Sequence, residues 1–344
     1  MSGKRIMFLD FIKGLAAMMV VMVHLPEKVG LYNTTISFVM VPLFFFASGY
    51  LTSVPQKHII RDFLYKRVAK LFVLYAIYAI ILPFTSITEI KQIVGNPILI
   101  IEKLVTSITK IFIGKAFWFV ACLIVINIIF FIVTLVSRRN NIAVLAVSTI
   151  LCIVGVIISE REMMPWHLDT ALVCQLIFVA GYLTKEYDIL AKIKMKKTVC
   201  IASLMLYLAV VFAGCFFFGT TEISIDCVLD IWGIWYISIP AIILGVVAFV
   251  LIGELSGGVK FINYIGAHSL LYFAFASHGG SIFVKLFAKI YSVTNFSLFS
   301  NPYIINPAAC ILGCLLMIIP CLLIDKFVPF LNGKFKMPVP KKYA

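Results

Sequence analysis

The feature that most constrains this chain is a series of ten stretches of about twenty mainly apolar residues. A bilayer core takes roughly 20 residues of helix to cross. The chain is 62% apolar and only 13% charged, whereas a soluble domain averages about 45–50% and 25%. The sequence therefore predicts an all-α polytopic membrane helical bundle. The ten predicted spans are residues 6–26, 34–54, 68–84, 116–136, 141–159, 166–184, 198–218, 233–252, 264–284 and 304–325.

Basic residues in the loops predict the orientation of these spans. The loops after even-numbered spans, together with Lys4 and Arg5, hold 20 of the 29 Lys and Arg residues. The positive-inside rule then places both termini in the cytoplasm. We expect one membrane-embedded domain over residues 1–344, with a short basic cytoplasmic tail at 326–344. The net charge of +14 follows the loops and forms no single basic patch, so nucleic-acid binding is not expected.

The first span contains three ionisable residues, Asp10, Lys13 and His24. With Ala17 they fall on one stripe of a helix, and the spacing lets Asp10 pair with Lys13. His24 lies about 16 Å further along the axis. Gly14 is small enough to let a neighbouring helix or a ligand approach. Such residues are functional by default in a membrane, although an interfacial ion pair with a histidine at the far end of the span explains them equally well.

The cytoplasmic end of the second span and the start of the third supply further candidates. Ser48 and Gly49 are small residues that permit close helix packing or admit a ligand chain. Lys66, Arg67 and Lys70 cluster at the next helix start. These cations suit phosphate groups, with Arg able to make bidentate contacts. The alternative is an ordinary positive-inside anchor.

Polar and aromatic residues also gather at the predicted outer side. Trp118 and Trp166 fit an aromatic belt at the interface. Asp169 follows in the first turn of the sixth span, where the helix dipole favours an anion. His278 precedes two glycines and lies at a predicted depth comparable to that of His24, so the two imidazoles are candidates for one site.

The nine cysteines are scattered and do not predict a metal site. The sequence contains no CxxC pair and no Cys/His arrangement at zinc spacing. Cys215 and Cys227 both lie near the predicted outer side, where a disulfide between them is an open alternative to two free thiols.

Seven sequence blocks, taken in order, resemble the acyltransferase-3 family of integral membrane acyltransferases, close to its fucose 4-O-acetylase-like branch. The resemblance runs from residue 4 to about 325. The blocks are LDFIKGLAAMMVVMVH (9–24), PLFFFASGY (42–50), KRVAKLFVLY (66–75), FWFVACL (117–123), PWHLDTAL (165–172), FVAGY (178–182) and IGAHSLLYFAFASH (265–278).

This resemblance implies an enzyme of the bacterial inner membrane. Such an O-acetyltransferase would move an acetyl or other short acyl group from cytoplasmic acetyl-CoA to a hydroxyl of an envelope polysaccharide or a lipid-linked sugar. The family's first-helix motif, an Arg and a His separated by ten residues, maps onto Lys13 and His24. The positive charge is thus kept, but the bidentate contacts of an Arg are lost. The family's basic motif maps onto Arg67 and Lys70, with Lys66 beside them.

On this basis each candidate residue receives an expected role. His24 is the expected general base, Asp10 holds Lys13 in place, and His278 or Ser277 donates to the oxyanion. Arg67, Lys70, Lys66, Ser48 and Gly49 are expected to bind the coenzyme, and Trp118, Asp169 and Trp166 the acceptor.

Two other classes of protein remain open. A transporter or flippase of a glycan precursor could use Asp10, Lys13 and His24 as a proton relay, although no inverted repeat is evident. A non-catalytic membrane scaffold would not need His24. The acceptor sugar, its hydroxyl, the acyl length and the oligomeric state are left open by the sequence.

Overall fold

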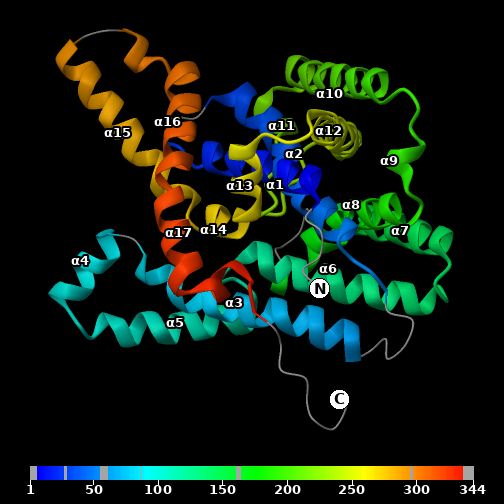
Figure 1. Ribbon diagram of the computed structural model, residues 1–344, viewed down its shortest axis with the longest axis horizontal. Coiled ribbons are helices and arrows are strands. Elements are labelled where there is room, and N and C mark those ends of the chain that lie inside the picture. Colours follow the sequence, from blue (N-terminus) through cyan, green and yellow to red (C-terminus); the bar gives the residue numbers. More distant parts are fainter. Residues whose placement is uncertain are drawn as a thin grey trace. The chain divides into compact units, whose positions relative to one another are not determined.

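The computed structural model describes residues 6–26, 29–54, 61–85, 87–159, 164–294 and 297–335. These residues form helices and contain no β-strand beyond one isolated bridge between Asp226 and Ile231 (Figure 1). The fold is thus the all-α membrane bundle that the sequence predicts. The chain divides into two compact units, which are described separately. Unit 1 is Met1–Leu51 with Ile177–Leu322, and unit 2 is Thr52–Leu176 with Leu323–Ala344.

Unit 1 is built around α1 (Met7–Val23). Leu9, Ile12, Ala16 and Ala17 of this helix are all but inaccessible, as expected of a mainly apolar helix that other helices enclose. In Figure 1 α1 lies among the other helices of its unit. Those helices are α2 (Gly30–Tyr50), α9 (Ile189–Lys192), α10 (Lys196–Phe218), α11 (Thr220–Ile223), α12 (Trp235–Ser256), α13 (Lys260–Ala267), α14 (Ser269–Ala274), α15 (Ala276–Thr294) and α16 (Pro302–Leu316).

Unit 2 has a core in which Tyr75 and Tyr78 are fully buried. The Tyr78 hydroxyl donates to the Leu331 carbonyl at 2.9 Å, which ties the C-terminal segment to α3. Helix α8 begins in this unit and continues into unit 1 from Ile177. Helix α17 (Ile318–Phe327) begins in unit 1 and continues into unit 2 from Leu323. The other elements of unit 2 are η1 (Arg61–Ala69), α3 (Lys70–Ile81), η2 (Leu82–Phe84), α4 (Ile87–Gly95), α5 (Leu99–Ile113), α6 (Trp118–Val136), α7 (Asn141–Ser159), η3 (Pro165–His167), the first part of α8 (Leu168–Glu186) and η5 (Pro329–Asn332).

Eight segments of the described chain are long and apolar enough to cross a bilayer by length and composition. They correspond to eight of the ten predicted spans. The first predicted span forms α1, a helix of 17 residues at the short limit for a span. The predicted ninth span, 264–284, is divided among α13, α14 and α15, because the main chain departs from helical geometry at His268 and Phe275. The total of ten membrane spans remains a prediction.

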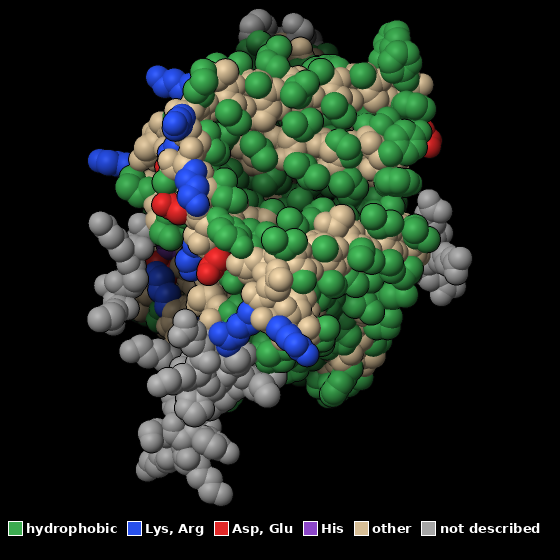
Figure 2. Space-filling model, turned by 90° about the vertical axis from the view of Figure 1, so that its right-hand side faces the viewer, with side chains coloured by type: hydrophobic (Ala, Val, Ile, Leu, Met, Phe, Trp, Pro, Cys, Tyr) green, Lys and Arg blue, Asp and Glu red, His purple; other side chains and the backbone are tan. Residues whose placement is uncertain are grey.

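The exposed surface of the helices is strongly apolar. Phe216 is 83% exposed and Val136 is 76% exposed, and hydrophobic side chains cover most of the face drawn in Figure 2. Large apolar surfaces of this kind are rare on soluble monomers. With the apolar helix lengths, they identify the chain as a multi-pass membrane protein.

Candidate active site

Asp10 and Lys13 form the ion pair that their spacing predicts. Lys13 Nζ lies 2.9 Å from Asp10 Oδ1, on one face of α1. The Lys13 side chain keeps 21% of its exposure, whereas that of Asp10 keeps 9%. The Asp10 side chain is therefore the more deeply buried of the two.

Helix α13 packs directly against the small residues of α1. A Cβ added at Gly14 would lie 2.9 Å from the carbonyl carbon of Ile262, and one added at Gly266 would lie 2.6 Å from the carbonyl carbon of Asp10. Ordinary carbon contacts begin at about 3.4 Å. The sequence left a helix or a ligand as the neighbour of Gly14, and in the structure this neighbour is a helix.

His24 ends α1 as its C-cap residue, and its side chain is exposed. Its Nδ1 lies 2.7 Å from the Val20 carbonyl oxygen. A carbonyl oxygen only accepts hydrogen bonds, so Nδ1 must carry the proton in this contact. The lone pair of the neutral ring is then on Nε2, the nitrogen that can accept a proton from a substrate.

The chain around His24 is anchored by α15 and α16. Leu25, the next residue, is buried against Val284 of α15 and Ala309 of α16. One turn and a half before His24, the Met18 carbonyl accepts a hydrogen bond from Cys310 Sγ of α16 at 3.2 Å. These contacts fix the end of α1 on both sides of the histidine.

The predicted partner of His24, His278, lies in the first turn of α15. The side chains of His278 and Ser277 lie outside the described part of the structure, so their predicted roles remain predictions. Another histidine is described in unit 1. His268 is buried between α13 and α14, with Nδ1 2.8 Å from the Tyr264 carbonyl and its ring 4.3 Å from the Tyr264 ring. Only its place in the block at 265–278 marks it in the sequence.

Gly49 is a close-packing position in unit 1. A Cβ there would lie 2.8 Å from the carbonyl carbon of Phe178 in α8, and one at Gly181 would lie 2.9 Å from that of Phe46 in α2. The two glycines let the main chains of α2 and α8 approach each other. This supports the packing interpretation of Gly49, whereas Ser48 beside it is partly exposed.

The predicted basic cluster lies in unit 2, at η1 and the start of α3. The Arg67 guanidinium donates through Nε to Oδ1 of Asn127, a fully buried amide in α6. Asn127 itself donates to the Leu123 carbonyl at 2.7 Å. Lys70 Nζ lies 5.2 Å from the centre of the Phe335 ring. The side chain of Lys66 lies outside the described residues.

Asn127 is not among the site residues predicted from the sequence. Its signal was a lone amide inside the run VINIIFF, where every other residue is aliphatic or aromatic. A buried amide in such a helix requires partners because burial without hydrogen bonds is costly.

Trp118, Trp166 and Asp169 are brought together around η3 in unit 2. The ring of Trp118 lies 5.9 Å from that of His167, edge to face. Trp166 stacks on Phe72 and donates from Nε1 to the Phe112 carbonyl at 3.0 Å.

Asp169 is fully buried in the first turn of α8, as predicted. Its carboxylate accepts from the Met164 amide at 2.6 Å and from the Thr170 amide at 2.7 Å. Asp169 thus caps the start of α8. Trp166 and His167 have φ of 61° and 53°, which is uncommon for residues with a side chain.

The described residues contain no group of metal-ligating side chains, and their cysteines are free thiols, Cys215 and Cys227 included. The free-thiol alternative is therefore the one that the structure shows for this pair.

A search of family models matches residues 6–326 to an acyltransferase domain. The chain belongs to the acyltransferase-3 family. The match covers the helices that carry Lys13, His24, Arg67 and Lys70, and makes this chain a membrane acyltransferase of that family. No curated protein and no solved structure matches the chain.

Proposed function

We propose that this acyltransferase moves an acetyl or other short acyl group from acetyl-CoA to a hydroxyl of an envelope polysaccharide or lipid-linked sugar, with His24 as general base. The observation that carries the proposal is the Nδ1 contact with the Val20 carbonyl. It fixes the tautomer of an exposed imidazole so that Nε2 is the basic nitrogen. An enzyme of this family needs such a base because a hydroxyl is a poor nucleophile until its proton is removed.

The proposed reaction is a direct transfer. As the acceptor oxygen bonds to the thioester carbon, its proton moves to Nε2 of His24. The carbon–sulfur bond then breaks, and the departing thiolate takes the proton from the imidazolium. His278 or Ser277 is proposed to donate to the oxyanion in between. The products are an ester and free coenzyme A, and His24 returns to its neutral form.

Lys13 and Asp10 act at a distance from this chemistry. About 16 Å of helix separates Lys13 from His24, so Lys13 does not touch the reacting atoms in this proposal. We assign it instead to the donor's entry path, held by Asp10 through the 2.9 Å ion pair. This assignment is supported by the Lys13 side chain, which is more exposed than that of Asp10.

The coenzyme phosphates are proposed to bind Arg67, Lys70 and Lys66, with Ser48 near the donor and Gly49 positioning that end of α2 through its close packing on α8. The hydrogen bond from Arg67 to the buried Asn127 supports a fixed guanidinium at this cluster. Trp118, Trp166 and Asp169 are proposed on the acceptor side, with the two rings as the sugar-facing surfaces. The positive-inside rule makes the basic cluster cytoplasmic, as a cytoplasmic donor and an inner-membrane location require.

The test uses purified full-length protein, acetyl-labelled acetyl-CoA and envelope polysaccharide, with ester-linked label as the measurement. His24→Gln keeps the size and polarity of the side chain but accepts no proton at neutral pH. We expect it to lose about 10²–10⁴-fold in rate. His58→Gln, at a histidine with no proposed role, is the matched control and should retain activity.

Near-normal labelling by His24→Gln, with the same thermal unfolding temperature as wild type, would exclude His24 as the base. Movement of a glycan precursor across vesicles without any ester-linked label would instead support the transporter class.

A further inference from the structure

Unit 2 contains a groove between α6, α7 and α8 that the proposed reaction does not use. Its volume is about 320 Å³, within the range of small-molecule sites. One wall is a stripe of α6 with the i, i+3, i+4, i+7 spacing of a single helix face. The residues of that stripe are Ile129, Ile132, Val133 and Val136.

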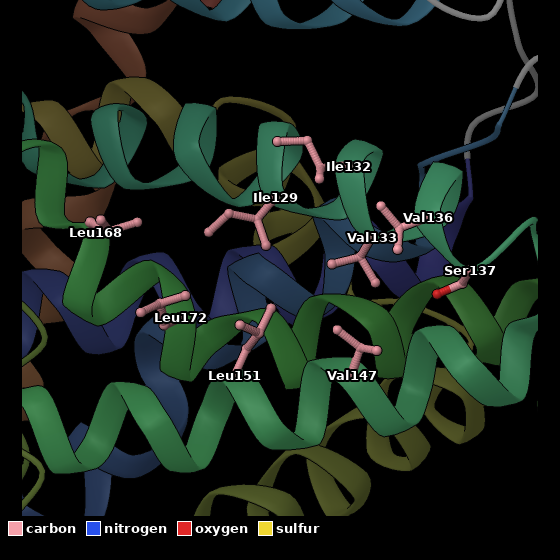
Figure 3. Close-up of a pocket in the computed structure, with 9 residues that line it drawn as sticks. All are labelled: Ile129, Ile132, Val133, Val136, Ser137, Val147, Leu151, Leu168 and Leu172. Carbon is pink, nitrogen blue, oxygen red and sulfur yellow. The ribbon is translucent and has the colours of Figure 1, made fainter.

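The other two walls are equally aliphatic. Val147 and Leu151 of α7 and Leu168 and Leu172 of α8 each lie one helical turn apart. Figure 3 shows side chains of the three helices directed into the same space. The remaining lining residue is Ser137, at the end of the groove where α6 stops. A sugar or nucleotide would find almost no hydrogen-bond partner here, whereas a hydrocarbon chain fits the chemistry of all three walls.

The rim of the groove is exposed on the surface. Ile132 and Val136 both line it and are strongly exposed, so a lipid chain beside α6 already contacts its rim. The apolar walls provide little preference by themselves, because a lipid chain is equally apolar in the bilayer. Selectivity must come from whatever contacts the headgroup.

Two arginines follow the groove at the Ser137 end. Arg138 and Arg139 are both exposed, and both have left-handed main-chain geometry, with φ of 48° and 62°. Their amides donate to the Leu135 and Thr134 carbonyls at 3.0 and 2.9 Å, which fixes the loop against the end of α6. The main chain of two exposed arginines is thus fixed immediately beyond an aliphatic groove.

We propose that this groove binds one acyl chain of an anionic phospholipid, with the lipid phosphate at Arg138 and Arg139. The match of charge is the deciding argument: a phosphodiester complements two guanidinium groups, and its acyl chain complements the groove. The positive-inside rule places this loop at the cytoplasmic leaflet, where anionic lipids attract basic residues. The attraction amounts to about five-fold in binding per arginine, or roughly thirty-fold for the pair.

Native mass spectrometry of the full-length protein tests this site. The protein is released from detergent in the presence of equal amounts of dipalmitoyl phosphatidylglycerol and dipalmitoyl phosphatidylcholine. We expect wild type to carry the anionic lipid preferentially, by roughly ten- to thirty-fold. R138Q/R139Q should lose that preference. K194Q/K197Q, which removes two exposed cations from another predicted cytoplasmic loop, should keep it.

A second pair of variants tests the groove itself. L151W fills the groove from α7 and should reduce binding of both lipids, whereas I150W places the same indole at a neighbouring α7 position that does not line the groove and should not. Unchanged lipid binding by L151W would overturn the proposal, as would equal effects of the two charge variants. Recovery of a lipid-linked sugar, rather than a phospholipid, from protein purified without added lipid would also overturn it.

Discussion

Replacing Gly266 by Ala should separate α13 from α1, the helix that carries the Asp10–Lys13 pair. The new Cβ would lie 2.6 Å from the carbonyl carbon of Asp10 and 2.9 Å from the amide nitrogen of Gly14. The Asp10 carbonyl oxygen lies closer still, and ordinary contact begins at about 3.4 Å, so α13 must move away from α1 by more than 1 Å. No side-chain rotation relieves this overlap, because the atoms on the α1 side belong to the main chain.

The expected cost can be bounded from two opposing effects. Overpacking of a close interface typically costs about 1–3 kcal/mol, and more where the main chain must move. Ala gains up to about 1 kcal/mol over Gly from helix propensity. We therefore expect a net loss of about 1–3 kcal/mol. A shift of 1 Å at functional groups can also reduce catalysis by about 10²-fold.

Thermal unfolding in detergent and the acetyl-transfer rate measure these two effects. Gly95→Ala is the matched control, because a Cβ at Gly95 meets no atom within 4 Å. Gly14→Ala should behave like Gly266→Ala, and the double variant should cost less than the two single losses combined, because one separation of the helices relieves both overlaps.

The reasoning would be refuted if Gly266→Ala unfolded at the same temperature as Gly95→Ala and transferred acetyl at the wild-type rate. A stable Gly266→Ala with reduced activity would instead show that α13 moves at little cost and that only the function depends on its position.

Three further predictions concern single polar contacts. Lys13→Arg should retain acetyl transfer, whereas Lys13→Met should abolish most of it. Lys13→Met should also lower stability by about 1–3 kcal/mol, since Asp10 loses its cation in a partly exposed site. Measuring the transfer rate and the unfolding temperature of both variants tests this prediction. Asn127→Leu removes the acceptor of Arg67 and should lower the acetyl-CoA-dependent rise in unfolding temperature; an unchanged rise would contradict the proposed phosphate site. Asp169→Ala should lower stability by about 1–2 kcal/mol, because the Met164 and Thr170 amides lose their acceptor, and an unchanged unfolding temperature would show that the cap contributes nothing.

The contacts between residues close in sequence were predictable because helix geometry alone determines them. Asp10 and Lys13 are three residues apart, so any helix over this segment allows them to pair. The first-turn position of Asp169 followed similarly from Pro165 and the apolar run after it.

The contacts between distant residues were not predictable in this way. Nothing in the sequence indicates that Arg67 donates to Asn127, because they are 60 residues apart and their helices meet only through packing. The break at His268 was also not predicted, because no proline marks it in the sequence.

The sequence by itself determined that this chain is a helical membrane protein, that its first helix carries a cation and an imidazole, and that it resembles the acyltransferase-3 family. These properties depend on local composition, on periodicity and on motif spacing. Only the tertiary structure decided that α13 fills the space beside Gly14 and that Phe178 fills the space beside Gly49. It also decided that Nδ1 of His24 bonds to the main chain. The physical reason is that a small residue permits close approach without specifying the neighbour, and only the packed fold supplies that neighbour.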